Sequence, residues 1–318
     1  MANQPISAGE LNARTQTIDG LGGFDAGRMA ALPDGRWLSF TGDATQTHAQ
    51  AWPVYDNAAV VWDCAGQRRV ASSHPGGHFF PRWEDGSEFW PLSFYVAGTR
   101  AYVLGTRVAP AGDMQWTALG AYGAVVDVPH GCDPAWVRYF PTPSSLTGDA
   151  AVQWFGAIAT DGTWVYVHGT LDRPDAWHAR DGGYVARVPA GQLEVPHRWT
   201  FWTGTQWSDR HDLAVSTIPV GGASTNGTSA SYTLHQRPND TWAVTTKRAG
   251  DLGNGLGRYL AATPWGPWTW EQQLPDTQVQ GLDCYLAGAA PTIPTVSGQL
   301  LVQWSRRGST PYWAEVPQ

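Results

Sequence analysis

Two aspartates flank the first clear hairpin of the chain, and carboxyl groups placed in this way are candidates for acid–base chemistry. Asp25 stands just before a short apolar run at 28–32, and Asp43 closes the strand expected at 37–41. Residues 33–35, Pro-Asp-Gly, favour a tight turn between the two strands. The two ends of an antiparallel hairpin lie side by side, away from its turn. The sequence therefore predicts a pair of neighbouring carboxyl groups.

Two carboxyl groups held close together resist simultaneous ionisation, so one of them keeps its proton at a higher pH. Hydrolysis of a glycosidic bond needs one protonated and one ionised carboxyl group on either side of the bond. Asp25 and Asp43 are the predicted catalytic pair, and which of them is the acid stays open. Glu88, just before a second aromatic strand, is the reserve acid.

The hairpin recurs along the chain at intervals of about sixty residues. After the first turn at Asp34-Gly35, further turns fall at Ala97-Gly98, Asp161-Gly162, Asn239-Asp240 and Ser297-Gly298. An outer strand pair follows each of the first four hairpins. Four strands repeated five times are typical of propeller blades. Neither Asp25 nor Asp43 recurs with the repeat, which favours chemistry over folding as the reason for the pair.

We therefore expect an all-β protein, a five-bladed β-propeller of four-stranded antiparallel blades forming one domain over residues 1–318. The last repeat lacks an outermost strand, and we expect the N-terminal segment, roughly Ala13 to Ile18, to supply it and close the ring. The alternative is a β-sandwich whose turns are evenly spaced by coincidence. Sandwiches rarely repeat an aromatic-rich turn–strand pattern five times.

In a propeller the start of each inner strand and the end of the next strand meet on one face around the axis. That face is concave and collects side chains from every blade, so it is the expected binding face. The chain contains 19 Trp, some of which are candidates for flat faces that stack on sugar rings. The predicted substrate-binding residues on this face are Arg28, Trp90, Gln153, Trp154, His168, Asn226 and Arg306.

Composition excludes several other classes of function. A formal net charge of −7 with few lysines argues against nucleic-acid binding. No apolar run is long enough to insert into a membrane, and no secretory signal is visible at the N-terminus. The three cysteines are widely spaced, and the histidines lack metal-ligand spacing, so we expect no metal and no cofactor. The oligomeric state is left open.

Several motifs in order resemble the DUF4185 family, five-bladed propellers that include the endo-D-arabinanases of glycoside hydrolase family 183. They are Asp25-Ala26-Gly27, Phe40-Thr41-Gly42-Asp43, Asp56-Asn57-Ala58, the segment 161–170 (DGTWVYVHGT), YVARVP at 184–189, WTFWTGTQW at 199–207 and ATPWGPW at 262–268. The likeness extends from about Gly20 to Val316. The chain departs from the family at Ala44, at Ala289-Ala290 and at Arg307, near the expected pocket, which puts the exact substrate in question.

The resemblance implies an endo-acting glycoside hydrolase whose substrate is D-arabinan, as in mycobacterial arabinogalactan and lipoarabinomannan. It also implies action on an extracellular cell-wall glycan, by an actinobacterial or phage protein. One rival is a non-catalytic carbohydrate-binding propeller or phage tail adhesin, which needs aromatic platforms but no proton donor. The other is a structural tail module, which needs neither.

Overall fold

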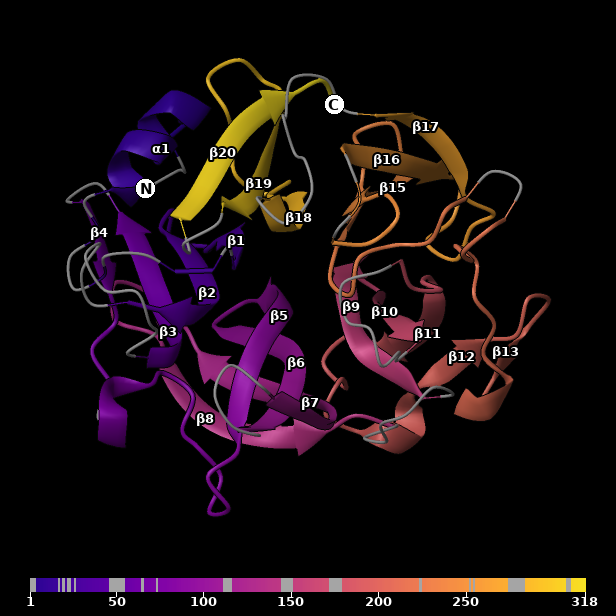
Figure 1. The fold of residues 1–318 in the computed structure, drawn as a ribbon, viewed down its shortest axis with the longest axis horizontal. Coiled ribbons are helices and arrows are strands. Elements are labelled where there is room, and N and C mark those ends of the chain that lie inside the picture. Colours follow the sequence, from indigo (N-terminus) through magenta and orange to yellow (C-terminus); the bar gives the residue numbers. More distant parts are fainter. Residues whose placement is uncertain are drawn as a thin grey trace.

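The computed structural model is a closed ring of five β-sheets. It describes residues 4–16, 18, 21, 24–25, 27–45, 55–63, 66–72, 74–110, 116–143, 151–171, 179–222, 225–251, 253, 255–273, 284–306 and 310–318. The sheets surround one axis like the blades of a propeller (Figure 1). The five-bladed, all-β architecture predicted from the repeated hairpins is confirmed.

Each blade is an antiparallel meander whose strands follow one another from the axis outward. Blade one contains β1 (Arg28–Ala31), β2 (Trp37–Ala44), β3 (Tyr55–Asp63) and β4 (Gly66–Arg69). Blade two contains β5 (Glu88–Ala97), β6 (Arg100–Pro110), β7 (Trp116–Asp127) and β8 (Ala135–Pro141). Blade three contains β9 (Val152–Thr160), β10 (Trp164–Leu171), β11 (Tyr184–Pro189), β12 (Thr200–Trp202) and β13 (Trp207–Ser208).

Blade four contains β14 (Thr233–Gln236), β15 (Trp242–Lys247), β16 (Leu256–Ala261) and β17 (Thr269–Gln273). Blade five contains β18 (Cys284–Ala289), β19 (Leu300–Arg306) and β20 (Thr310–Val316). Three short 3₁₀ turns lie in loops, at Pro75–Gly77, Pro196–Arg198 and His211–Leu213. In Figure 1 the strands β4, β8, β13 and β17 lie on the outside of the ring.

The prediction of a strand at Ala13–Ile18 is wrong. Residues Ala8–Thr15 form a helix, α1, that packs against β20 on the outside of blade five (Figure 1). Ser7 caps the start of the helix, because its hydroxyl accepts a hydrogen bond from the backbone N–H of Glu10 at 3.1 Å. A serine followed by a good helix former is a local signal for this helix in the sequence.

The helix nevertheless completes the edge of the last blade. The Asn12 side chain donates to the Trp313 carbonyl at 2.9 Å and accepts from the Trp313 N–H at 2.8 Å. One amide side chain therefore makes the two hydrogen bonds that a neighbouring strand residue would make. Exposed edge groups of a sheet invite pairing with other chains, and Asn12 removes that opportunity at Trp313.

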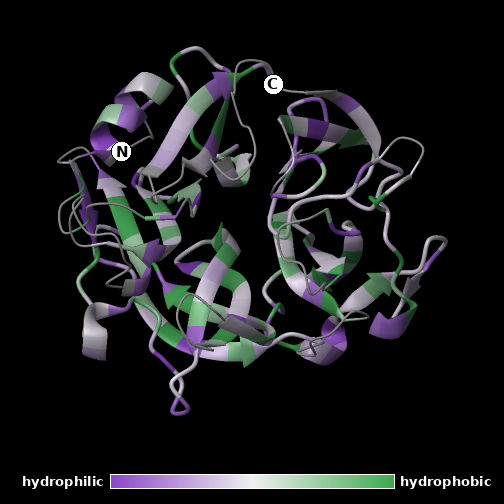
Figure 2. Ribbon diagram, viewed as in Figure 1, coloured by the Kyte–Doolittle hydropathy of each residue, from purple (hydrophilic) through white to green (hydrophobic). Residues whose placement is uncertain are grey.

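Hydrophobic clusters fill the spaces between neighbouring blades. One joins blades one and two around Phe40, Phe80 and Phe89, and another joins blades two and three around Trp154. Hydrophobic residues follow the strands and hydrophilic ones gather in peripheral loops (Figure 2). Within the described residues, no helix is long and apolar enough to cross a membrane.

Candidate active site

The first hairpin brings Asp25 and Asp43 together, as its strand pattern predicts. In β1 and β2, Arg28 lies opposite Phe40, with the turn at the far end. The Asp25 backbone N–H donates to the carbonyl of Gly42 at 3.2 Å, which places Asp25 beside the end of β2. Asp25 is buried, with 8% of its surface exposed, and Asp43 is half-buried.

Asp43 has an unusual backbone conformation. Its φ angle is +37°, in a region that residues other than glycine seldom adopt. In the pairing of β2 with β3, Gly42 faces Asn57 and Ala44 faces Tyr55, so the unbroken register places Asp43 opposite Asp56. Strained backbone of this kind is concentrated at functional sites, where it directs a side chain that regular geometry would turn away.

Asp56, on β3, is a third carboxylate of the site, and it was not among the predicted site residues. It enters because β3 runs back alongside the end of β2. Arg82 binds it through both carboxylate oxygens, at 2.7 and 2.8 Å. The ring of His78 also contacts it, with 3.3 Å between Nδ1 and Oδ2. The signal was available, since an antiparallel third strand must begin where the second one ends.

Glu88, the first residue of β5, brings blade two into the same site. Its carboxylate pairs with Arg82 Nη2 at 2.7 Å and is almost completely buried. Burial is the largest cause that raises the pKa of Glu88 to about 7; repulsion from Asp56 adds to the rise, and Arg82 and the Trp90 indole oppose it. Glu88 is therefore partly protonated near neutral pH.

Asp43 lies at the centre of these carboxylates. Burial is the largest cause that raises the pKa of Asp43 to about 8, and repulsion from Asp25, Glu88 and Asp56 adds to it. A carboxyl group with this pKa carries a proton at neutral pH. We call Asp25, Asp43, Asp56 and Glu88 the acidic cluster.

Blade five supplies a hydroxyl group to the acidic cluster. The Tyr285 hydroxyl, on β18, donates a hydrogen bond to Asp25 Oδ1. A hydroxyl donor suits an ionised carboxylate, so Asp25 fits the charged member of the predicted pair. Tyr285 was not predicted, because nothing near it in the sequence reports a contact with a residue 260 positions away.

The two predicted aromatic platforms differ. Trp90 is half-buried and packs edge-on against Trp116, with 5.0 Å between ring centroids. Trp154 has no exposed surface and lies against Trp199 and Phe201 in the core between blades two and three. We therefore correct the prediction for Trp154, which stabilises the blade interface and has no face to offer a sugar.

Two other predicted binding residues are also interior. Gln153 is 2% exposed and His168 is 0% exposed. His168 Nε2 lies 2.7 Å from the Pro264 carbonyl, and Nδ1 lies 3.3 Å from the Tyr232 hydroxyl. Burial lowers the pKa of His168 to about 4, so the imidazole is neutral and structural. The predicted binding role of His168 is therefore corrected, whereas that of Gln153 stays a prediction, because Asp25 and Glu88 in the acidic cluster are buried as well.

Arg28 is at the axis, but its guanidinium is used by the fold. It donates to the Leu286 carbonyl at 2.9 Å, to the Ser231 hydroxyl at 3.0 Å and to the Ala287 carbonyl at 3.4 Å. Arg28 thereby ties blade one to blades four and five. Burial lowers its pKa to about 10, against the attraction of Asp251. We correct its predicted role from substrate binding to ring closure.

For the last two predicted binding residues, Asn226 and Arg306, the described contacts give no link to the acidic cluster. Asn226 is half-buried in the loop before β14, where its backbone N–H donates to the Tyr259 hydroxyl at 3.1 Å. No interaction recorded for its side chain links Asn226 to the acidic cluster. The backbone of Arg306 pairs with Cys284 at the end of β19, and its side chain lies outside the described atoms.

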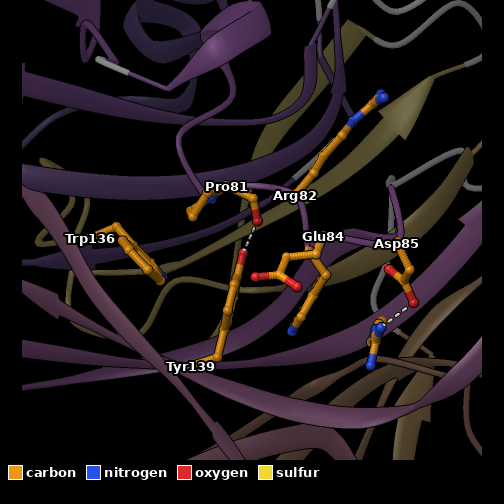
Figure 3. Close-up of a pocket in the computed structure, with 8 residues that line it drawn as sticks. Pro81, Arg82, Glu84, Asp85, Trp136 and Tyr139 are labelled. Atoms are coloured by element: carbon orange, nitrogen blue, oxygen red, sulfur yellow. Dashed lines mark hydrogen bonds and ion pairs between the residues drawn. The ribbon is translucent and has the colours of Figure 1, made fainter.

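A cavity of about 500 Å³ opens beside the segment that carries Arg82. It is lined by Pro81, Arg82, Trp83, Glu84, Asp85, Arg107, Trp136 and Tyr139 (Figure 3). The Tyr139 hydroxyl donates to the Pro81 carbonyl at 2.7 Å, and Trp83 stacks on Tyr139 at 4.1 Å. The Arg82 side chain extends away from Trp136 and Tyr139 (Figure 3). The contacts of Pro81 and Trp83 with Tyr139 therefore anchor the backbone of Arg82, whose guanidinium binds Asp56 and Glu88.

Metal coordination receives no support from the geometry of the described residues. Within that part of the chain, no three His, Cys, Asp or Glu side chains are arranged to hold a metal ion. The acidic cluster instead combines a protonated carboxyl group at Asp43, a hydroxyl-bonded carboxylate at Asp25 and a partly protonated Glu88. This set suits proton transfer to and from a bound substrate.

Comparison with solved structures extends the fold assignment. A Bacteroides ovatus protein described as a suspected hydrolase matches with a TM-score of 0.71 at 12% identity, over 96% of this chain and 88% of that one. The GH43_1 enzyme of Xanthomonas citri, complexed with xylose, matches with a TM-score of 0.55 at 13% identity, over 97% and 92%. The Bacteroides ovatus xyloglucan GH43B protein matches with a TM-score of 0.50 at 14% identity, over 93% of this chain and 53% of that one.

These likenesses show a shared propeller fold, with glycoside hydrolases among the neighbours. No curated protein matches the sequence. The resemblance to the DUF4185 family is not confirmed, because the family model that matches, over residues 11–303, is a different one. The chain belongs to the DUF5005 family, a domain of unknown function.

Proposed function

We propose that this protein is an endo-acting glycoside hydrolase that uses the acidic cluster to cleave internal linkages of D-arabinan. The observation that carries the proposal is Asp43, a half-buried carboxyl group on strained backbone whose pKa three neighbouring carboxylates help to raise to about 8. Folding alone does not need such an arrangement, since grouped like charges oppose the compact state. A reaction whose leaving oxygen must receive a proton near neutral pH is served by it.

Asp43 is the proposed proton donor. Its carboxyl proton passes to the glycosidic oxygen as the bond between that oxygen and the anomeric carbon breaks. Asp25 is the proposed ionised partner, consistent with the hydroxyl that it accepts from Tyr285. It either removes a proton from the water that attacks the anomeric carbon or attacks that carbon itself, and the anomeric configuration of the first product distinguishes the two routes.

Glu88 remains the reserve acid in this proposal. It is partly protonated near pH 7, and its position is fixed by Arg82. Its carboxyl group stands at the start of blade two, whereas Asp25 and Asp43 belong to blade one. If Asp43 only tunes its neighbours, Glu88 is the group that delivers the proton.

The polymer is proposed from the sequence resemblance, and the general class is supported by the glycoside hydrolases that share the fold. The test is incubation of the protein with D-arabinan, and separately with L-arabinan and xylan, followed by sizing of the products. We expect D-arabinan to yield a ladder of short oligosaccharides early in the reaction. Binding to D-arabinan without cleavage would instead identify a carbohydrate-binding propeller, and cleavage of xylan alone would correct the substrate.

A further inference from the structure

Trp116 differs from the other tryptophans in the described part of the chain. It is 41% exposed, whereas each of the others there is buried or half-buried. It begins β7, at the end of the long hairpin that β6 and β7 form in blade two. A large apolar side chain that is exposed on a regular strand is a candidate surface for binding a ligand or a partner.

The strand register places Trp116 on the same side of blade two as Glu88. Glu88 lies opposite Val108, and Val108 lies opposite Ala118. Directly opposed residues share a face of the sheet, and so do residues two apart on one strand. Trp116 is two residues from Ala118 and therefore lies on the face of Glu88, closer to the turn that joins β6 and β7.

Trp90 connects these two residues. It lies two positions after Glu88, and its ring meets that of Trp116 at an interplanar angle of 67°. Its indole lies close enough to the Glu88 carboxyl group to lower the pKa of that group. The three side chains form a line of contacts across blade two, from Glu88 on β5 through Trp90 to Trp116 on β7.

We propose that Trp116, supported by Trp90, is a stacking platform for one sugar ring of a neutral glycan chain, next to the ring whose bond lies at the acidic cluster. This inference rests on the proposed function, because it takes the acidic cluster as the cleavage point. A flat indole face matches the C–H face of a furanose or pyranose ring. The edge-on contact with Trp90 holds the Trp116 ring in place, so little side-chain freedom remains to be lost on binding.

We expect a sugar and not a second copy of the protein to cover Trp116, because Trp116 is linked through Trp90 to the acidic cluster. The platform adjoins Glu88, so a chain bound at the acidic cluster and extending along blade two reaches Trp116. A self-association surface would have no need of a link to a carboxyl group. Sedimentation of the wild-type protein and of Trp116→Thr tests this alternative, since a change in mass on substitution would overturn the proposal.

The direct test follows the indole N–H resonance of Trp116 by NMR, assigned from its loss in Trp116→Phe. The probes are D-arabinofuranose oligosaccharides of four to eight units, then L-arabino- and xylo-oligosaccharides of the same lengths. We expect this resonance to shift with one of these series. We expect Trp116→Thr to weaken binding by about tenfold and Trp116→Phe, which keeps a flat ring, by less than about threefold.

The control is Trp207→Ala, which removes a half-buried tryptophan from β13 at the outer edge of blade three. It should leave the affinity unchanged. No shift of the Trp116 resonance with any probe would overturn the platform, as would equal affinity of Trp116→Thr and wild type. A shift with an oligosaccharide that is never cleaved would keep the platform and reject the proposed hydrolysis, so the two failures are distinguishable.

Discussion

Two groups of charged side chains near the axis differ in the sign of the charges that they gather. The acidic cluster on blades one and two gathers four carboxyl groups with Arg82 among them, and Asp43, at its centre, is half-buried. A basic cluster, Arg28, Arg180 and Lys247, surrounds the carboxylate of Asp251 on the side of blades four and five. All three of its cations are at most 7% exposed.

The clusters differ in what their charged groups contact. Arg28 and Lys247 donate to backbone carbonyls of neighbouring segments, and Asp251 accepts the N–H of Leu286. Those contacts join elements that meet at the axis, so the basic cluster stabilises the closed ring. In the acidic cluster, burial raises the pKa values of Asp43 and Glu88, and the like charges that face one another add to the rise. Grouped like charges oppose folding, so chemistry is the better explanation for them.

The largest effect that we predict is on rate, in the acidic cluster. Asp25→Asn and Asp43→Asn should each slow D-arabinan cleavage by at least about a hundredfold, the scale expected for removal of an acid or base. Their circular dichroism should match that of wild type. Asp240→Asn is the matched control, since Asp240 also has a positive φ, +63°, but lies in a turn of blade four, and it should keep the wild-type rate. Near-normal cleavage by either cluster variant would remove that residue from the mechanism.

The basic cluster should respond in stability instead. Arg28→Met leaves the Leu286 and Ala287 carbonyls without their donor, and we expect it to lower the free energy of unfolding by roughly 2–4 kcal/mol. Urea unfolding measures this. Arg210→Met, which removes an exposed ion pair with Asp212, should leave the stability close to that of wild type. If Arg28→Met were as stable as wild type, the two clusters would not differ in the way that we describe.

The Asp43 carboxyl group should lower the free energy of unfolding, and by more at high pH than at low pH. Its pKa is raised from 3.8 to about 8 by folding, so the native state holds a proton that the unfolded chain releases. Wild type therefore loses stability as the pH rises from 3.8 toward 8. Asp43→Asn lacks this dependence, and Asn tolerates the positive φ. The free energy of unfolding of Asp43→Asn, relative to wild type, should therefore increase with pH, by roughly 1–3 kcal/mol at pH 8. Thermal melts at pH 4, 6 and 8 measure it, and a constant difference would contradict the assignment.

The smallest effect concerns Arg82, the cation inside the acidic cluster. Arg82 lowers the pKa of Glu88, so Arg82→Met should raise it above about 7, whereas Arg82→Lys, which keeps the charge, should leave it nearer the wild-type value. The measurement is the limb of the pH–rate profile near pH 7, which should move to higher pH in Arg82→Met. A profile that stayed in place while the rate fell would give Arg82 a merely structural role.

The fold was predictable because its signal repeats. Five turn–strand patterns at even spacing indicate five blades, and one hairpin is enough to predict that Asp25 and Asp43 are neighbours. The N-terminal helix was not predicted, because the expectation of a closing strand outweighed the local helix-capping signal at Ser7. A missing outer strand in the sequence pattern predicts that some segment covers the sheet edge, but it does not predict whether that segment is a strand or a helix.

The rest of the site depends on information that a single strand does not carry. Trp154 and His168 stand near the ends of inner strands, yet alternation turns both into the cores between blades. Arg82 and Tyr285 reach the acidic cluster from a loop of blade two and from blade five. Such contacts arise only when the ring closes, so neither residue type nor spacing along the chain reports them.

The most direct test of the account is the titration of the Asp43 carboxyl group in the free protein. Carboxyl ¹³C resonances of aspartate-labelled wild type, with Asp43 assigned from its loss in Asp43→Asn, should be followed from pH 3 to pH 10. We predict that Asp43 releases its proton near pH 8, because burial and the charges of Asp25, Glu88 and Asp56 retain it. Titration near pH 4, as for an ordinary aspartate, would contradict the claim that the acidic cluster holds a proton ready for transfer.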